Sequence, residues 1–351
     1  MIPVSCLPSL TALLPWGSQA LSALGVPLNL AAWFPVFFIF GVVPGIDALC
    51  GIEQRNWDTT GQRDALEARG YFRALTLWVL PLWLATLVGC CWQFLQLPLD
   101  TVGRLGWLVS TGVIGGVLAI NPAHELIHKS GRLEPLFGGI LLTSVGYQGF
   151  KIEHVRGHHV HVATPHDSSS AALGESAYAF VPRALWRNVR NAWQLESRRL
   201  HEHGHAPRSW RNEMIRWYLL WLLMIGAFAL AGGALGVLFF LAQSVLAAAT
   251  LEVINYVEHY GLSRQEIAPG RYERITPLHS WNAPQRYTNW LLFNLQCHSD
   301  HHAQPRRRYR ALLHHAESPP LPAGYASMFM LALVPPLWRR VMDHRALACI
   351  R

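Results

Sequence analysis

The sequence predicts an all-α, polytopic membrane protein with six transmembrane helices and a histidine-rich region on the cytoplasmic side. Of its 351 residues, 51% are hydrophobic and only 14% are charged, and soluble domains are rarely so poor in charge. The runs 75–99, 105–124 and 217–250 contain no Asp, Glu, Lys or Arg. About 20 apolar residues cross a bilayer, so these runs predict membrane helices rather than helices buried in a soluble core.

The chain reads as one membrane-embedded domain, 1–351, with an apolar N-terminus that needs separate treatment. Residues 1–22 lack the positive region of a signal peptide, so we interpret them as containing a first membrane helix. Gly232-Gly233 is the expected turn within the longest apolar run. The expected membrane helices, in order, lie near 5–22, 29–50, 72–97, 103–122, 215–233 and 236–257.

Two further segments are expected to be helical without crossing the membrane. The apolar stretch 136–150 is short and glycine-rich, which favours a re-entrant or interfacial segment. Residues 182–203 alternate Trp and Leu with Arg, which predicts an amphipathic helix on the cytoplasmic face. Residues 160–177 between them are expected to form a loop.

The positive charge indicates the orientation in the membrane. The formal net charge is +8, yet no Lys or Arg precedes Arg55. With six helices, the basic segments 51–71, 123–214 and 260–351 all fall on one side. The positive-inside rule makes that side the cytoplasm, which predicts a multi-pass protein with its histidine-rich region on the cytoplasmic side.

The basic surface suits acidic lipids or an acidic protein partner, because no nucleic-acid-binding motif occurs. The run Arg306-Arg307-Arg308 is most simply solvated or lipid-facing charge, and alternatively a docking surface for an electron donor. The six cysteines form no CxxC pair, so we expect neither disulfides nor a cysteine-based zinc site.

Eighteen histidines carry the functional signal. His298, His301 and His302 lie at i, i+3 and i+4, and a helix projects residues at this spacing from one face. Neighbouring His158 and His159 would point about 100° apart on a helix, toward two different ions. Every group falls at or near a helix end on the expected cytoplasmic side. The candidates are His124 and His128; His154, His158 and His159; His259; and His298, His301 and His302.

Nine imidazoles are too many for one four-coordinate zinc and suit two metal ions with open positions. Neutral imidazole binds Fe, Cu, Zn or Ni, so the ligand type alone does not choose the metal. His124-Glu-Leu-Ile-His128 also has the spelling of a zinc protease, which would leave the other groups unexplained. Carboxylates beside the histidines are expected to orient them through the second ring nitrogen: Glu125, Glu153, Glu258 and Asp300.

Together these motifs resemble the integral-membrane alkane monooxygenases (alkane hydroxylases), relatives of the membrane fatty-acid desaturases. The similarity lies in His-Glu-Leu-Ile-His-Lys, Glu-His-Val-Arg-Gly-His-His, Asn-Tyr-Val-Glu-His-Tyr-Gly and Leu-Gln-Cys-His-Ser-Asp-His-His. It extends to Ala163-Thr-Pro165 with Asp167 and covers roughly 120–345 closely. The chain departs from the family pattern at Cys297, where an Arg is expected, and at Ile127, which replaces a common small residue.

The resemblance implies a non-haem di-iron enzyme that uses O2 to hydroxylate the terminal methyl group of n-alkanes. All nine histidines would be iron ligands, and electrons would come from a rubredoxin reduced by an NAD(P)H-dependent reductase. No GxGxxG nucleotide motif occurs in the chain, which agrees with an external donor. A substrate channel would be lined by aromatic side chains, whose alternative role is lipid-facing or packing bulk: Trp33, Phe34, Phe37, Phe38 and Phe40.

Other functions remain open from the sequence. A xylene-type side-chain hydroxylase or a fatty-acid desaturase or hydroxylase would carry similar histidine groups. A membrane metal transporter or sensor is a different class, and it predicts ionisable ligands near the middle of the spans. Here the histidines lie at the expected helix ends, which favours the enzyme.

Overall fold

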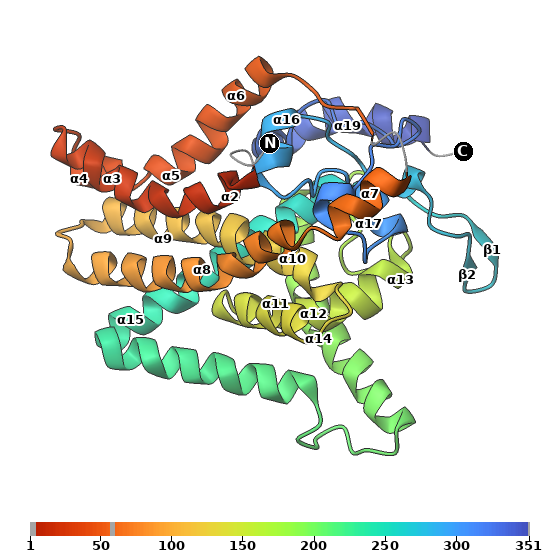
Figure 1. Cartoon of the computed structure of the whole chain (residues 1–351), viewed down its shortest axis with the longest axis horizontal. Helices are drawn as coiled ribbons and strands as arrows, with labels where there is room; N and C mark the ends of the chain where they lie inside the picture. The colour runs from red at the N-terminus through yellow and green to blue at the C-terminus, as the bar shows by residue number, and fades with distance from the viewer. Residues whose placement is uncertain (1–4, 57–59, 350–351) are drawn as a thin grey trace.

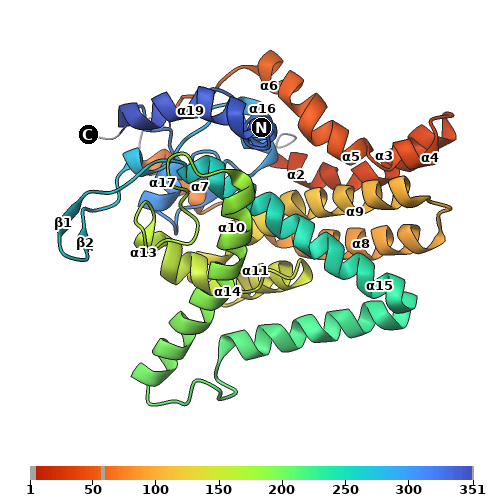
Figure 2. The same ribbon diagram turned by 180° about the vertical axis from the view of Figure 1, so that it is seen from behind.

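The computed structural model describes residues 5–349 except 57–59 and is built almost wholly from helices (Figure 1). Within these residues, the regular strands are β1 (Glu266–Ala268) and β2 (Arg271–Tyr272), which pair as a small antiparallel hairpin. The hairpin projects from the body of the molecule (Figure 2). All six cysteines are free, as the sequence predicted.

Three helices in the described residues are long and apolar enough to cross a membrane. The first is α8 (Gly70–Gln96). The second, Thr101–Ile127, is composed of α9 (Thr101–Gly115), the π-helical turn η3 (Gly116–Ile120) and α10 (Asn121–Ile127). It returns beside α8 as an antiparallel hairpin (Figure 1). Asp100 caps its start by accepting a hydrogen bond from the Gly103 amide at 2.8 Å, which satisfies a free N–H of the first turn.

The third long helix, α15 (Glu213–His259), turns back on itself at Gly233. Gly233 has a φ of 57°, a conformation that glycine adopts without steric cost. The predicted helices 215–233 and 236–257 are therefore two antiparallel halves joined at the predicted glycine turn.

The N-terminal part follows the helices predicted near 5–22 and 29–50, with local irregularities. Three adjoining segments occupy 7–23, and one apolar helix, Phe34–Cys50, continues through a π-helical turn. Pro8, Pro15, Pro35 and Pro44 each lie in the first turn of a segment, where the missing N–H disturbs the hydrogen-bond pattern. The segments are α2 (Leu7–Leu10), η1 (Thr11–Leu13), α3 (Leu14–Ala23), α4 (Leu28–Ala31), α5 (Phe34–Phe37), η2 (Phe38–Val42) and α6 (Val43–Cys50).

Two helices outside the long spans follow the sequence predictions in part. The stretch predicted as re-entrant or interfacial forms α11 (Leu133–Ser144), which packs against α8, α10 and α15. Its glycines permit this contact, since a Cβ at Gly139 would lie 2.4 Å from the Trp217 ring. The predicted amphipathic helix is α14 (Ala177–Glu202), which buries Phe180, Ala184 and Leu200 along one face.

The remaining helices gather at one end of the long ones, around the last turn of α15 (Figures 1 and 2). There Trp338 packs against Tyr256 of α15 and against Tyr260, which directly follows that helix, and Tyr325 belongs to the same buried cluster. This end holds every candidate histidine. The elements are α7 (Thr60–Glu67), α12 (Phe150–Glu153), η4 (His154–His158), α13 (His159–His161), η5 (Pro277–His279), α16 (Arg286–Leu291), α17 (His298–Ala303), η6 (Tyr309–Ala311), α18 (Tyr325–Ala332) and α19 (Pro335–Cys349).

Candidate metal centre

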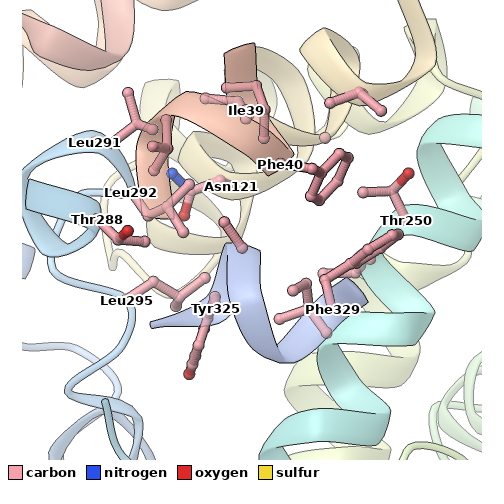
Figure 3. Close-up of a pocket in the computed structure, with 17 residues that line it drawn as sticks. Ile39, Phe40, Asn121, Thr250, Thr288, Leu291, Leu292, Leu295, Tyr325 and Phe329 are labelled. Atoms are coloured by element: carbon pink, nitrogen blue, oxygen red, sulfur yellow. The ribbon is translucent and has the colours of Figure 1, made fainter. Parts of the chain in front are cut away.

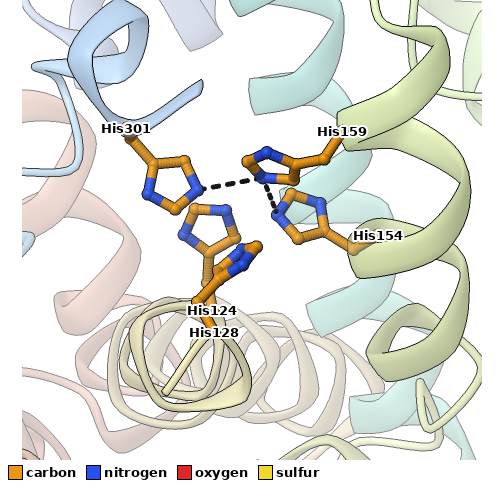
Figure 4. Close-up of side chains that lie close together, drawn as sticks. All are labelled: His124, His128, His154, His159 and His301. Atoms are coloured by element: carbon orange, nitrogen blue, oxygen red, sulfur yellow. Dashed lines mark hydrogen bonds between the residues drawn. The ribbon is translucent and has the colours of Figure 1, made fainter. Parts of the chain in front are cut away.

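The nine predicted histidines converge from four separate parts of the chain into two adjacent groups. In each group the nearest ring nitrogens all lie within 4.8 Å of one another. Figure 4 shows the five-membered group, whose rings point toward a common centre. The five are His124, His128, His154, His159 and His301, and the other four are His158, His259, His298 and His302.

A π-helical turn determines how His154, His158 and His159 are distributed between the two groups. His154–His158 forms the π-helix η4, in which residues five apart lie on the same face. His154 therefore joins His159, with their Nε2 atoms 3.1 Å apart, while His158 belongs to the other group. A regular helix would have paired His154 with His158.

The histidines at 298–302 also divide between the two groups, which the sequence did not predict. His298 and His302 share one group, and His301 lies in the other. The three side chains project from one face of the short helix α17, and that face meets both groups at their boundary.

The nitrogen spacing fits metal ligation. The Nε2 atoms of His159 and His301 are 3.1 Å apart, and those of His298 lie 3.2 Å from His259 and 3.1 Å from His302. Ligand nitrogens at ~2.1 Å from one ion lie roughly 3 Å apart. The Nε2 atoms of His128 and His158 are also buried without a hydrogen-bond partner, and a bound cation would satisfy them.

The electrostatics keep these imidazoles neutral. Burial, and then the neighbouring histidines, lower the pKa of His154, His159, His301 and His302 well below its usual value. A neutral imidazole offers the lone pair that a metal requires. These four imidazoles therefore accept a cation without a competing proton. His158 differs, because burial would lower its pKa but the Asp167 carboxylate raises it.

The carboxylate that orients a histidine is Asp167, which was not among the predicted orienting residues. His158 Nδ1 lies 3.0 Å from both Asp167 oxygens. Burial alone would raise the pKa of Asp167, but His158 and the Ser170 hydroxyl lower it to about 2. The ionised carboxylate fixes the proton on Nδ1 and leaves Nε2 free for a metal. Asp167 lies in the loop that follows, nine residues after His158 and eight after His159, so a search for carboxylates adjacent to histidines in the sequence did not find it.

The four predicted carboxylates differ in their contacts. Glu258 lies 3.3 Å from His298 Nε2, so it meets the inward-facing nitrogen instead of the outer one. Glu153 accepts a hydrogen bond from Ser168 at 2.5 Å. Glu125 pairs with Lys129 at 2.9 Å. No contact between these carboxylates and an outer histidine nitrogen of the two groups occurs among the described residues.

Asp300 and the run Arg306–Arg308 stabilise the backbone near the histidines at 298–302. Arg307 donates two hydrogen bonds to Asp300, at 2.6 and 2.8 Å, and Arg308 pairs with Glu134 at 2.9 Å. Lys129 donates to the Arg306 and Arg307 carbonyls. The prediction of solvated charge is therefore wrong for Arg307 and Arg308, whose side chains are 18% exposed.

A narrow apolar cavity of about 80 Å³ lies against the same helices (Figure 3). Its lining residues come mainly from η2, α6, α9, η3, α10, α15, α16 and α18. Of the five aromatic residues expected along a substrate channel, Phe40 lines this cavity, whereas Trp33, Phe34, Phe37 and Phe38 do not. Phe37 is 65% exposed, and Trp33 donates to the Val102 carbonyl at 3.2 Å. The lining also includes Ile39, Val43, Val113, Gly116, Val117, Asn121, Thr250, Leu251, Ile254, Thr288, Leu291, Leu292, Leu295, Tyr325, Ala326 and Phe329.

Comparison with known proteins places this arrangement in a defined class. Residues 101–332 match the model of the fatty acid desaturase family. Alkane 1-monooxygenase 2 of Pseudomonas aeruginosa is 48% identical over 340 residues, which cover 93% of this chain and 90% of that protein. Alkane 1-monooxygenase 2 of Alcanivorax borkumensis is 48% identical over 314 residues, covering 90% and 82%.

The histidine-rich membrane fold and the family match identify the chain as a member of the fatty acid desaturase family. Within it, the chain belongs with the alkane 1-monooxygenases and is an oxidoreductase. A more distant relative is the xylene/toluene monooxygenase hydroxylase component XylM of Pseudomonas putida. It is 31% identical over 234 residues, which cover 66% of this chain and 62% of that protein.

Proposed function

We propose that this protein is a non-haem di-iron monooxygenase that converts n-alkanes to 1-alkanols with O2. The observation that carries the proposal is the pair of buried histidine groups beside an apolar cavity. The relatives named alkane 1-monooxygenase supply the substrate class. The five-membered group would hold one iron and the four-membered group the other, and the bound irons would activate O2.

The chain itself supplies binding, positioning and exclusion of water. An alkane has no polar group, so its affinity comes from burying methylene groups, at about 0.8 kcal/mol each. The cavity offers Leu291, Leu292, Leu295, Ile254 and Phe329 for this purpose. Asp167 keeps His158 in the tautomer that binds metal.

We assign electron delivery to a rubredoxin, itself reduced by an NAD(P)H-dependent reductase. A wide cleft is lined by Arg55, Arg69, Arg286, Arg310 and Cys297, and by Glu53, which pairs with Arg286 at 3.6 Å. Its excess of positive charge suits an acidic donor, and Cys297 directly precedes the candidate ligand His298. This cleft replaces Arg306–Arg308 as the proposed docking surface. Raising ionic strength should increase the rubredoxin concentration that gives half-maximal rate, and a salt-independent value would contradict an electrostatic donor site.

We propose six membrane crossings in a bacterial inner membrane, with the histidines on the cytoplasmic side. The two halves of α15 and the two N-terminal groups of short helices would add to α8 and α9–α10. An epitope inserted at exposed Gly25 should be accessible only from the periplasm, and one at exposed Gly204 only from the cytoplasm. Equal accessibility of both would refute this topology.

The proposal is tested by metal and product analysis of the purified protein. We expect two irons per chain without haem, a di-iron signal in Mössbauer spectra, and 1-octanol from octane when the donor system is present. One zinc per chain would overturn the iron assignment. A desaturated product would overturn the reaction.

The second candidate is hydroxylation of a methyl group on an aromatic ring. It is favoured by the similarity to XylM. Octane, hexadecane, xylene and an acyl lipid offered to the same membranes separate the two, since exclusive oxidation of xylene would replace the alkane proposal.

A further inference from the structure

The lining of the apolar cavity includes one amide side chain, and it has no hydrogen-bond partner. Asn121 lies at the start of α10, is 5% exposed and lines the cavity (Figure 3). Neither its Oδ1 nor its Nδ2 has a hydrogen-bond partner. Buried amides without partners are rare because their desolvation is not compensated, so the cavity is suited to a molecule that carries a polar group.

The two threonine hydroxyls of the lining are already hydrogen-bonded. Thr250 donates to the Leu246 carbonyl at 2.8 Å, and Thr288 donates to the Asp47 carboxylate. The Tyr325 hydroxyl makes no hydrogen bond, but it points away from the other labelled lining residues (Figure 3) and interacts with the Glu258 carboxylate. Asn121 is therefore the lining amide whose donor and acceptor are both free in the described part of the chain.

The unpaired Oδ1 and Nδ2 of Asn121 can form hydrogen bonds with a hydroxyl group but not with a hydrocarbon. A hydroxyl donates one hydrogen bond and accepts others, so it can bind Oδ1 and Nδ2 at once. An alkane can satisfy neither atom. Asn121 also precedes the candidate ligand His124 by three residues, which places both on one face of the helix.

From this geometry we infer that Asn121 is the site that recognises the hydroxyl group of the primary alkanol in the substrate cavity. This inference rests on the proposed alkane hydroxylation and adds to it a polar subsite for an oxygenated chain. The consequence is selective inhibition by 1-alkanols, because the amide distinguishes them from alkanes of equal size.

The test compares two inhibitors of octane hydroxylation by the iron-loaded enzyme with its donor system. For the wild type and for Asn121→Leu, inhibition constants are measured for 1-octanol and n-nonane, corrected for their partition into the membrane. We expect the substitution to weaken 1-octanol by about tenfold and n-nonane by less than twofold. Equal weakening of both, or no change in 1-octanol, would overturn the inference.

Thr250→Val is the matched control, since it removes a lining hydroxyl whose hydrogen bond is already made. It should leave the ratio of the two inhibition constants at the wild-type value, whatever its effect on rate. If Asn121→Leu does not fold, wild-type inhibition by 1-octanol and 1-fluorooctane decides the question. Equal inhibition by both would overturn the inference, because fluorine donates no hydrogen bond. Failure to form any 1-octanol from octane would instead refute the proposed function.

Discussion

His158 Nδ1 and the Asp167 carboxylate lie 3.0 Å apart at both oxygens, and both side chains are buried. Since such a partner fixes the tautomer of a ligand histidine, we expect Asp167→Asn to lower metal affinity by about 10–100-fold. Iron retained after dialysis against a graded chelator measures this. Glu175→Gln is the control, because Glu175 is a nearby carboxylate that pairs with Arg183. Equal iron retention in both variants would show that Asp167 does not orient a ligand.

Neighbouring histidines of α13 provide a second prediction with an internal control. His159 belongs to the five-membered group, whereas His161, two residues later, belongs to neither group. His159→Ala should lose iron and hydroxylation, and His161→Ala should keep both, when the two variants reach the membrane in equal amounts. His298→Ala should behave as His159→Ala does. Retained activity in His159→Ala would remove that residue from the ligand set.

The Arg307–Asp300 pair predicts a stability effect that its neighbour Arg306 lacks. Arg307→Ala removes two hydrogen bonds to a buried carboxylate, and hydrogen bonds to charged groups each contribute about 1.5–3 kcal/mol. Thermal unfolding should therefore occur several degrees lower. Arg306 is exposed, and Arg306→Ala removes the same charge with an expected change within about 0.5 kcal/mol. Equal melting temperatures would exclude a structural role for the pair.

The sequence predicted the composition of the metal centre better than its geometry. Spacing and position identified all nine histidines that come together, because metal ligands must be gathered from a few residue types. It could not predict that His154 pairs with His159, since this depends on a π-helical turn. Nor could it find Asp167 as the partner of His158, because their contact depends on how the following loop folds back.

The fold was likewise predicted in part from the sequence. Charge-free runs predicted α8, α9–α10 and both halves of α15, and the Gly233 turn followed from glycine chemistry. The helix predicted near 29–50 is divided into α4 and an apolar helix over Phe34–Cys50, a break that hydrophobicity did not indicate. Packing determines the location of the cavity, and hydrophobicity alone could not distinguish Phe40, which lines it, from exposed Phe37.

Glu196 predicts a specific dependence of stability on pH. Burial would raise its pKa, but hydrogen bonds from Arg199, the Glu213 amide and Arg156 lower it from 4.5 to about 2. Because the pKa falls on folding, the ionised carboxylate contributes stability fully above about pH 4.5 and loses it as the pH falls toward 2. The difference in melting temperature between wild type and Glu196→Gln should shrink over that range. A difference independent of pH would contradict the assigned charge, and Glu202→Gln, exposed on the same helix, is the control.

The cavity predicts a change in chain-length preference. Ala326 lines it from α18 and is 7% exposed, so Ala326→Leu adds apolar bulk inside the cavity. Long chains depend on the whole cavity for their binding energy. The variant should therefore lose hexadecane oxidation by at least about tenfold relative to octane, the cost of excluding two methylene groups at ~0.8 kcal/mol each. Products from a mixture of the two alkanes measure this ratio. Ala227→Leu adds the same bulk to an exposed position of α15 and should not change it. An unchanged ratio in Ala326→Leu would show that the substrate occupies a different space.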